Sequence, residues 1–266
     1  ELVLEGEAVD GGVLYEHAFG VSYHTREEMT NRTVDLALDY GGGEIDALTV
    51  RMETFSEKTP TVETDVRYPQ VDGISDKDQA EQLNSELRNT AMAWKDAFTR
   101  DVTGAPDPLG SKSSINVEAT VAYLSPEIMS VRYEASVYSA GAAHPNLLYK
   151  TLNWDIAHAV SINTDDLFVA EADWVTRFSE LSIADLERQF ADAGDDFEAL
   201  SADIRSGAGP RADNFRAWTM DRDGITLHFE PYQVAAYAAG PQHVEIPWRE
   251  LAALLDPAAT SAALRR

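Results

Sequence analysis

Three side chains near the middle of the chain could together carry out acyl-transfer chemistry. Ser139 and His144 lie on either side of a short run of small residues, and Asp155 follows them. A serine hydroxyl becomes a nucleophile when a histidine takes its proton and a carboxylate orients that histidine. The chain has no Gly-x-Ser-x-Gly elbow, and the residues around Ser139 supply no obvious oxyanion hole. A secreted carboxylesterase that uses these three residues is therefore the alternative hypothesis rather than the leading one.

The segment around His144 has a second interpretation, as architecture that supports a binding surface. Gly141 can adopt a positive φ angle. Pro145 favours an extended conformation of His144 and leaves the imidazole free to bond to loop carbonyls. We therefore expect His144 to hold strands together rather than to catalyse. The residues predicted to contribute to binding are Tyr138, Gly141, His144, Pro145, Asn146 and an acidic group, Asp192, Asp195 and Asp196.

Neither a metal ion nor an organic cofactor is expected from the sequence. The chain contains no cysteine, which removes thiolate zinc sites and disulfides. Its 6 histidines are scattered and form no His-Glu-x-x-His pair. Asp221 and Asp223 precede Gly224 as in a calcium loop, but the further oxygen ligands of such a loop are missing. A hairpin turn explains these residues better.

Charge is the strongest compositional signal. The 266 residues include 46 acidic side chains against 21 Lys and Arg, which gives a formal net charge of −25. Nucleic acid is not expected as a partner, because phosphate contacts need a basic surface. Direct membrane insertion is not expected either, because no apolar run is long enough to span a bilayer. The acidity favours a cationic partner, or else serves solubility alone.

The first part of the chain is predicted to be rich in strands. Residues 33–40 alternate hydrophobic with polar or small side chains, and a glycine-rich turn leads to a second strand near 45–52. This pattern is typical of a hairpin. The polar stretch 54–64 is typical of a linker. We therefore predict a small β-rich unit over residues 1–64 and a main domain over residues 65–266.

A long helix and three long strands are predicted to follow. Ser75 and Asp78 have the spacing of a capping box at the start of the helix. Residues 114–124 and 128–138 alternate as in an antiparallel hairpin, and a third strand is expected over 147–154. The helix is indicated by hydrophobic residues at steps of three and four, namely Ala80, Leu83, Leu87, Ala91, Trp94 and Phe98.

The last third of the chain predicts helices followed by a second set of strands. Two helical stripes are expected around Trp174 and Leu186, with Ser182 capping the second. A hairpin turn is expected at 221–224, then a strand and a short helix after Pro247. Strands and helices segregate without regular βαβ alternation. The predicted fold class is therefore α+β, a mostly antiparallel sheet with packed helices, plus a small N-terminal β unit.

Several ordered motifs resemble one extracytoplasmic bacterial domain family. Gly141-Ala142-Ala143-His144-Pro145 is similar to that family's Gly-Gly-Ala-His-Pro signature, with Ala142 in place of the commoner glycine. The family is the one shared by the extracellular part of the anti-sigma factor RsiV and a secreted mycobacterial immunogenic protein. The other matching motifs are Tyr68-Pro69-Gln70-Val71-Asp72-Gly73, Leu83-Asn84, Asn153-Trp154-Asp155, Asp165-Asp166-Leu167-Phe168, Asn214-Phe215, Trp218, Asp223-Gly224-Ile225, Tyr237-Ala238-Ala239-Gly240-Pro241 and 244–247.

The resemblance implies an exported α+β protein. The RsiV relative is a receptor for lysozyme, while other members are reported as esterases or have no settled role. Lysozymes are strongly basic, so a chain of net charge −25 would attract one. We therefore expect an extracytoplasmic, non-enzymatic binding or sensing domain at the bacterial cell envelope. The expected partner is a cationic protein such as lysozyme or a cell-wall component, and a signal peptide or anchor is expected to precede Glu1.

Overall fold

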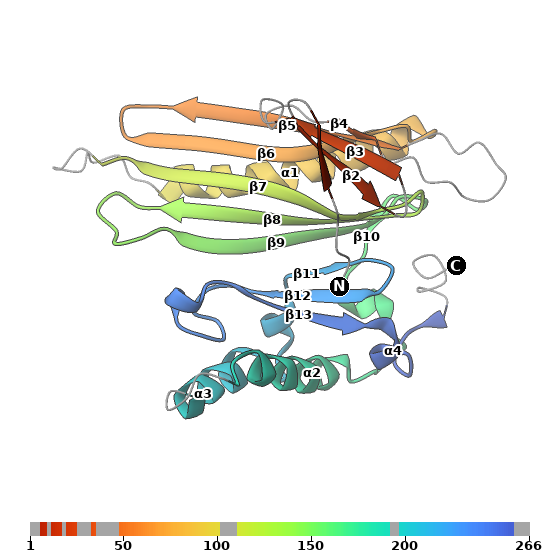
Figure 1. Cartoon of the computed structure of the whole chain (residues 1–266), viewed down its shortest axis with the longest axis vertical. Coiled ribbons are helices and arrows are strands. Elements are labelled where there is room, and N and C mark those ends of the chain that lie inside the picture. The colour runs from red at the N-terminus through yellow and green to blue at the C-terminus, as the bar shows by residue number, and fades with distance from the viewer. Residues whose placement is uncertain are drawn as a thin grey trace.

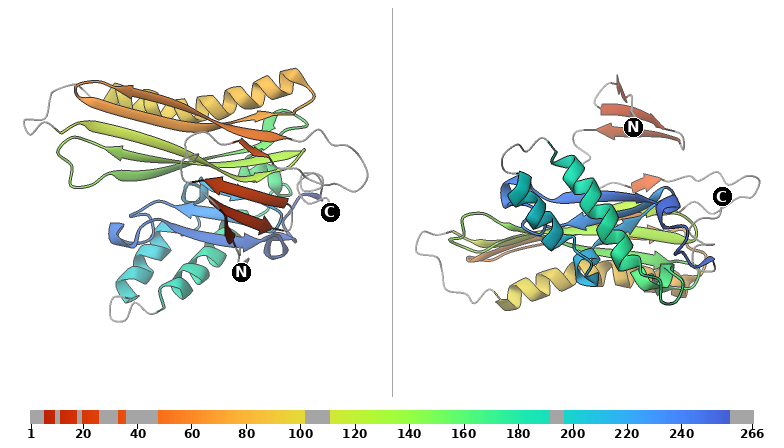
Figure 2. Two further views of the ribbon diagram at one scale, coloured as in Figure 1. Left: turned by 45° about the horizontal axis from the view of Figure 1, so that its top comes forward. Right: turned by 90° about the horizontal axis from the view of Figure 1, so that it is seen from below.

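The computed structural model describes residues 6–9, 12–17, 20–25, 33–35, 48–101, 111–191 and 197–257. A large sheet and a small sheet lie next to each other, and each has helices on one side (Figures 1 and 2). A separate N-terminal sheet has the order β1-β2-β3. Its strands are β1 Gly6–Val9, β2 Gly12–His17 and β3 Gly20–Thr25.

Seven strands form the large sheet, in the spatial order β10-β9-β8-β7-β6-β5-β4. Neighbouring strands are antiparallel except for β6 and β7, which are parallel. The strands are β4 Thr33–Asp35, β5 Thr49–Lys58, β6 Val62–Asp72, β7 Ser113–Leu124, β8 Ile128–Tyr138, β9 Asn146–Asp155 and β10 Val160–Ser161. The predicted hairpin over 114–124 and 128–138 is confirmed as β7 and β8.

Helix α1, Lys77–Asp101, is the crossover that joins the parallel strands β6 and β7. A parallel pair cannot be joined by a tight turn and needs such a connection. The apolar stripe of α1 packs on one face of the large sheet, where Leu83, Leu87 and Ala91 are fully buried. The helix is capped by Asp76, whose Oδ1 accepts the backbone N–H groups of Asp78 and Gln79. The predicted Ser75 cap was therefore placed one residue too early.

The small sheet has the order β11-β12-β13 and is antiparallel throughout. Its strands are β11 Trp218–Met220, β12 Gly224–Phe229 and β13 Gln242–Pro247. The remaining elements are η1 Thr164–Leu167, α2 Trp174–Gln189, α3 Phe197–Gly207, η3 Ala212–Phe215, η4 Tyr237–Ala239 and α4 Trp248–Leu251. The turn between β11 and β12 confirms the hairpin interpretation of residues 221–224.

Helix α2 is continuous where the sequence suggested two helices. Asp173 caps it, because its side chain accepts the backbone N–H of Thr176. Ser182, predicted to cap a second helix, is fully buried in the middle of α2. The two predicted stripes thus belong to a single helix, which packs against β13.

The predicted division at residue 64 falls inside a strand of the large sheet. β5 and β6 pair along their whole length, from Thr49 opposite Asp72 to Lys58 opposite Glu63. The polar stretch at 54–64 is therefore the exposed end of a hairpin rather than a linker. The predicted pairing between the segments 33–40 and 45–52 is seen for β4, which pairs with the start of β5.

Two hydrophobic cores hold the described part of the chain together. The first lies between α1 and the large sheet and is mainly aliphatic. The second lies between α2, η3, α4 and the small sheet and is rich in aromatic rings. The mixed sheet, the small sheet and the packed helices confirm the predicted α+β class. Among the described residues, none of the helices is long and apolar enough to cross a membrane.

Candidate functional site

Strand β9 is where the large and small sheets meet. Its partner β10 covers only the end of β9, at Trp154 and Asp155. Along the rest of β9, the hydrogen bonds to the small-sheet region involve side chains. The two sheets are not joined there by strand pairing. The backbone N–H of Tyr149 donates to Glu230 Oε1 at 2.9 Å, and that of Trp218 donates to Thr151 Oγ1 at 3.3 Å.

A buried polar chain fixes the two sheets together beside this edge. Ser130 Oγ donates to Asn153 Oδ1 at 2.6 Å, and the backbone N–H of Met220 donates to Ser130 Oγ at 3.0 Å. Asn153 Nδ2 then donates to the carbonyl of Trp218 at 3.0 Å. Ser130 and Asn153 are both buried, so these bonds satisfy groups that water cannot reach. The geometry of the boundary is therefore specific.

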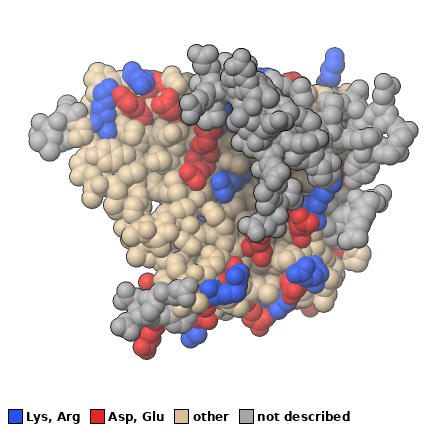
Figure 3. Space-filling view, viewed as in Figure 1, with Lys and Arg blue, Asp and Glu red and all other residues tan. Residues whose placement is uncertain are grey.

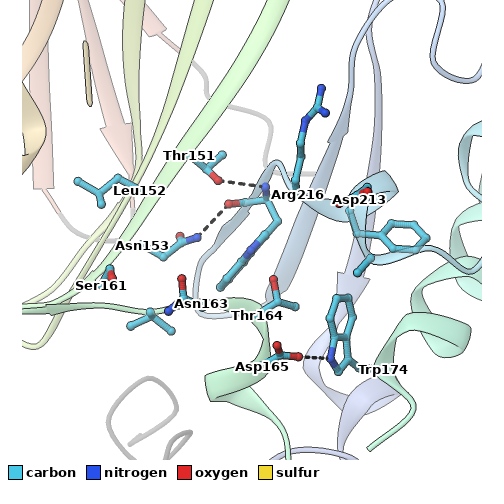
Figure 4. A pocket seen from close by; sticks show the side chains of 14 residues that line it. Thr151, Leu152, Asn153, Ser161, Asn163, Thr164, Asp165, Trp174, Asp213 and Arg216 are labelled. Carbon is cyan, nitrogen blue, oxygen red and sulfur yellow. Dashed lines mark hydrogen bonds between the residues drawn. The ribbon is translucent and has the colours of Figure 1, made fainter. Parts of the chain in front are cut away.

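A pocket of about 320 Å³ opens at this boundary (Figure 4). Such a volume is at the lower end of the range for small-ligand sites. Its lining comes from β9, from the stretch that runs from β10 into η1, from the start of α2, and from the stretch that runs from η3 into β11. The lining residues are Thr151, Leu152, Asn153, Ser161, Ile162, Asn163, Thr164, Asp165, Trp174, Ala212, Asp213, Phe215, Arg216 and Trp218.

Asp165 is held in a defined orientation at one side of the pocket. Trp174 Nε1 donates to Asp165 Oδ1 at 2.7 Å, shown as a dashed line in Figure 4. The preceding turn is fixed by a capping box, in which the backbone N–H of Asn163 donates to Asp166 Oδ2 at 2.8 Å. Local sequence therefore presents one exposed carboxylate next to a buried indole ring.

Two charged residues line the opposite side, Asp213 and Arg216. The Arg216 guanidinium donates to Glu230 Oε2 at 3.1 Å and forms an ion pair with it. Glu230 is largely buried and also accepts the N–H of Tyr149. The positive charge of Arg216 is thus balanced by a fixed carboxylate, whereas Asp165 and Asp213 leave the pocket negative.

The lining groups of the pocket are of the kind that bind a small polar ligand. Its lining offers hydroxyls, amides and carboxylates above buried aromatic rings. It contains no histidine that could activate a serine or threonine hydroxyl. Polar groups that converge over an apolar floor are typical of sites that orient a small polar ligand.

The predicted His-Pro loop lies elsewhere, between β8 and β9, and its histidine is in an aromatic cluster. His144 stacks on Tyr237 with ring centroids 3.8 Å apart. Its Nδ1–H donates to the Pro145 carbonyl at 3.0 Å, and its Nε2 lies 3.3 Å from Tyr232 Oη. Tyr237 Oη also donates to the Pro145 carbonyl at 2.9 Å. These contacts join the loop to the segment between β12 and β13.

The structure does not bring the proposed esterase residues together. Asp155 ends β9, at the far end of that strand from His144, and its carboxylate bonds to His158 Nδ1 at 2.8 Å. The two ring nitrogens of His144 face Pro145 and Tyr232, while Ser139 is exposed. A strand of ten residues separates its ends by roughly 30 Å. Closeness in sequence was misleading because the segment between His144 and Asp155 is extended.

The other residues predicted to bind a ligand flank the same loop. Tyr138 ends β8 and Asn146 begins β9. Gly141 has a φ angle of 85°, as its glycine character suggested. The acidic group Asp192, Asp195 and Asp196 lies outside the described residues.

A histidine pair lies on the small sheet, with His228 buried and His243 partly buried. His228 Nδ1 is 2.9 Å from His243 Nδ1, and Thr219 Oγ1 is 2.9 Å from His228 Nε2. Burial, together with the nearby His243 and Arg132, lowers the pKa of His228 to about 3. Burial and Arg132 also lower the pKa of His243. Both rings are therefore neutral at physiological pH. Within the described ranges, no three His, Asp or Glu side chains group in a way that could hold a metal ion.

Comparison with known families divides the chain into two successive segments. Residues 55–147 match a family described as "Deacetylase PdaC", and residues 165–249 match a family described as "Protein of unknown function (DUF3298)". The chain therefore carries a PdaC-like segment, within the large sheet, followed by a DUF3298-like segment, which contains the small sheet and its helices. The pocket is lined by residues 151–164, which lie between the two matched segments, and by residues of the DUF3298-like segment.

Two kinds of curated relative share the sequence pattern. The peptidoglycan-N-acetylmuramic acid deacetylase PdaC of Bacillus subtilis is 26% identical over 167 residues, 62% of this chain and 34% of PdaC. The immunogenic protein MPB64 of Mycobacterium bovis is 28% identical over 109 residues, 41% of this chain and 44% of MPB64. The expected resemblance to a mycobacterial immunogenic protein is thus confirmed. The chain spans about a third of PdaC and less than half of MPB64.

Two solved structures share the fold. A DUF3298 family member from Bacteroides fragilis superposes with a TM-score of 0.56 at 18% identity, covering 82% of this chain and 98% of that one. A DUF3298 family protein from Pseudomonas aeruginosa gives a TM-score of 0.58 at 13% identity, covering 78% and 95%. Because the sequence identities to both structures are low, these similarities establish only that the fold is shared.

Sequence reasoning did not identify the pocket, although a signal for it was present. The motifs that carried the family resemblance contain four pocket residues, namely Asn153, Asp165, Phe215 and Trp218. These motifs are far apart in the chain, and only the packing of the small sheet against β9 brings them together. Their convergence on one pocket is what marks it as the candidate functional site.

Proposed function

We propose that this chain is an extracytoplasmic, non-enzymatic binding domain at the bacterial cell envelope, and that its pocket takes a saccharide of the cell wall. The observation that carries the proposal is the pocket between the two sheets, where carboxylates, amides and hydroxyls surround buried aromatic rings. The name of PdaC places its substrate in peptidoglycan, which lies outside the cytoplasmic membrane. That name supports both the location and the ligand class.

The lining suits a sugar ring better than a purely apolar ligand. Among the aromatic rings of the lining, Trp174 keeps 9% of its surface exposed and can contact the C–H groups of a pyranose, whereas Phe215 and Trp218 are almost fully buried. Asp165, Asn163 and Thr164 offer acceptors and donors for hydroxyls at the rim. Catalysis by PdaC is not transferred, because the chain corresponds to about a third of that enzyme. The family name DUF3298 assigns no activity.

Co-sedimentation with purified, insoluble peptidoglycan tests this proposal. The wild-type chain is expected in the pellet, and Asp165→Ala is expected to weaken retention about tenfold through loss of a charged hydrogen-bond acceptor. Asp203→Ala is the matched control, because Asp203 is an exposed aspartate on α3 outside the pocket lining. Soluble peptidoglycan fragments should compete. Absence of wild-type retention, or equal weakening in both variants, would contradict the proposal.

Docking of a cationic protein such as lysozyme is a second candidate function, supported by the net charge of −25. On the face in Figure 3, acidic and basic side chains of the described residues are intermixed rather than gathered in one acidic patch. We therefore expect such docking to be weak and steered by the overall field. Titration with lysozyme over a salt series tests it: binding should fall steeply as salt rises. No binding at low salt would remove this candidate.

A further inference from the structure

The charges that line the pocket at the boundary of the two sheets point to one class of saccharide. Asp165 lines it from η1 and Asp213 from η3, so a negative charge stands on each of two separate segments. The one cationic residue among the lining side chains, Arg216, is paired with Glu230. Because this pairing leaves the lining negative, an acidic ligand group would be repelled and a cationic one attracted.

We infer that the pocket selects an amino sugar with a free amine over its N-acetylated form, an inference that rests on the proposed saccharide function. A protonated amine offers three N–H donors and a positive charge, whereas an acetamide offers one N–H and no charge. A charged donor on a carboxylate forms a hydrogen bond roughly twice as strong as a neutral pair.

Asp165 is the carboxylate best placed to receive the amine. Its Oδ1 accepts the indole N–H of Trp174 at 2.7 Å, so the side chain is oriented before a ligand arrives. That is the single hydrogen bond recorded for this carboxylate within the described ranges, and Oδ2 remains as an acceptor. Pre-orientation lowers the entropy lost on binding. The carboxylate is also exposed, so a ligand amine can reach it from the solvent side.

Two disaccharides that differ only at nitrogen separate this inference from the general function. The probes are chitobiose with two free amines and N,N′-diacetylchitobiose, titrated calorimetrically into the whole chain at low salt. Wild-type protein is expected to bind the amine form about tenfold more tightly, the ratio that one charge-assisted hydrogen bond provides.

The variants Asp165→Asn and Asp213→Asn remove charge without removing volume. In Asp165→Asn the amide oxygen can still accept the Trp174 N–H, so folding should be preserved, and the thermal midpoint checks this. We expect the affinity ratio of the two probes to fall towards one in both variants. Asp203→Asn, with the same change in net charge on exposed α3, should keep the wild-type ratio.

The outcomes distinguish the inference from the function on which it rests. If both sugars bind equally and Asp165→Asn weakens both, the pocket binds saccharides and the amine preference is wrong. If Asp203→Asn lowers the ratio as much as Asp165→Asn, the preference comes from overall charge and the inference is overturned. If neither probe binds and peptidoglycan is not retained either, the inference and the proposed function both fail.

Discussion

The two hydrophobic cores of this chain differ in what they bury. The core under α1 buries mainly aliphatic side chains, such as Val66, Val117 and Val131. The core under the small sheet buries a chain of aromatic rings, in which Phe178 contacts Trp174 and Phe215 edge to face. Buried polar bonds gather at the border of this second core, around Ser130, Asn153 and the histidine pair.

This difference explains where the pocket lies. The core between α1 and the large sheet is closed mainly by hydrophobic side chains from the two elements. The small sheet must instead be attached to the edge of β9, whose outward backbone groups require partners. Side chains satisfy some of them, and the gap that remains is lined by polar groups. The pocket is therefore a consequence of how the two sheets join.

The largest expected effect is in the aromatic core. Phe178→Ala removes a fully buried ring that contacts three others, and should lower the free energy of unfolding by about 3–5 kcal/mol. The matched control is Phe55→Ala, because Phe55 is only partly buried against the first core and should lose about 1–2 kcal/mol. Urea unfolding followed by tryptophan fluorescence measures both. Equal losses would mean that the two cores do not differ as described.

The next effect is at the boundary of the sheets. Asn153→Ala removes both the acceptor of Ser130 Oγ and the donor to the Trp218 carbonyl, so two buried groups lose their partners. We expect a loss of about 2–3 kcal/mol in unfolding free energy. Asn146→Ala, at the exposed start of the same strand, should change it by less than about 0.5 kcal/mol. A small effect of Asn153→Ala in urea titrations would show that the buried polar chain does not hold the sheets together.

The histidine pair should make the small sheet sensitive to acid. The folded state keeps His228 neutral down to a pKa of about 3, whereas an unfolded histidine titrates near a pKa of about 6.5. The unfolded state therefore binds more protons between these values. The histidine contribution to stability is complete above about pH 6.5 and is lost as pH falls towards 3.

Comparison of two variants isolates this contribution from that of the many carboxylates. Between pH 7 and pH 4.5, wild-type protein should lose about 1–2 kcal/mol more stability than His228→Gln loses. His158→Gln is the control, because His158 is exposed and lies at the other end of β9 beside Asp155. Identical pH profiles for wild-type protein and His228→Gln, from thermal melts, would contradict the neutral histidine pair.

The smallest effect on stability is expected at Ser139 and His144, the residues of the alternative esterase hypothesis. Ser139→Ala alters an exposed hydroxyl that His144 does not contact, so unfolding free energy should change by less than about 0.5 kcal/mol. His144→Ala removes the ring stacked on Tyr237 and should lose about 1 kcal/mol. Short acyl esters serve as the activity probe. Turnover that disappears in Ser139→Ala would restore the catalytic interpretation.

Local patterns predicted most elements, because they depend on neighbours in sequence. Period-two alternation located β7 and β8, and the apolar stripe located α1. The parallel pairing of β6 with β7 was missed, because register between strands separated by a helix depends on packing rather than on alternation. The N-terminal caps predicted at Ser75 and Ser182 were wrong. The spacing of a serine and an acidic residue does not show whether the serine precedes a helix or is buried within one.

The pocket could not be assembled from sequence for a related reason. Its residues come from β9, β10, η1, α2, η3 and β11 and from the connections beside them, and nothing in the chain order specifies that these elements meet. Proximity in sequence favoured Ser139, His144 and Asp155 instead. The extended conformation of β9 separates His144 from Asp155.

Mapping of a bound saccharide by NMR tests the central claim most directly. Isotope-labelled protein would be titrated with soluble peptidoglycan fragments while backbone amide shifts are recorded. The largest shifts are expected at residues 161–165 and 212–218, which line the pocket, with little change around His144 and Tyr232. Shifts centred on the His144 and Tyr232 cluster, or no shifts at saturating fragment concentration, would contradict a saccharide site between the two sheets.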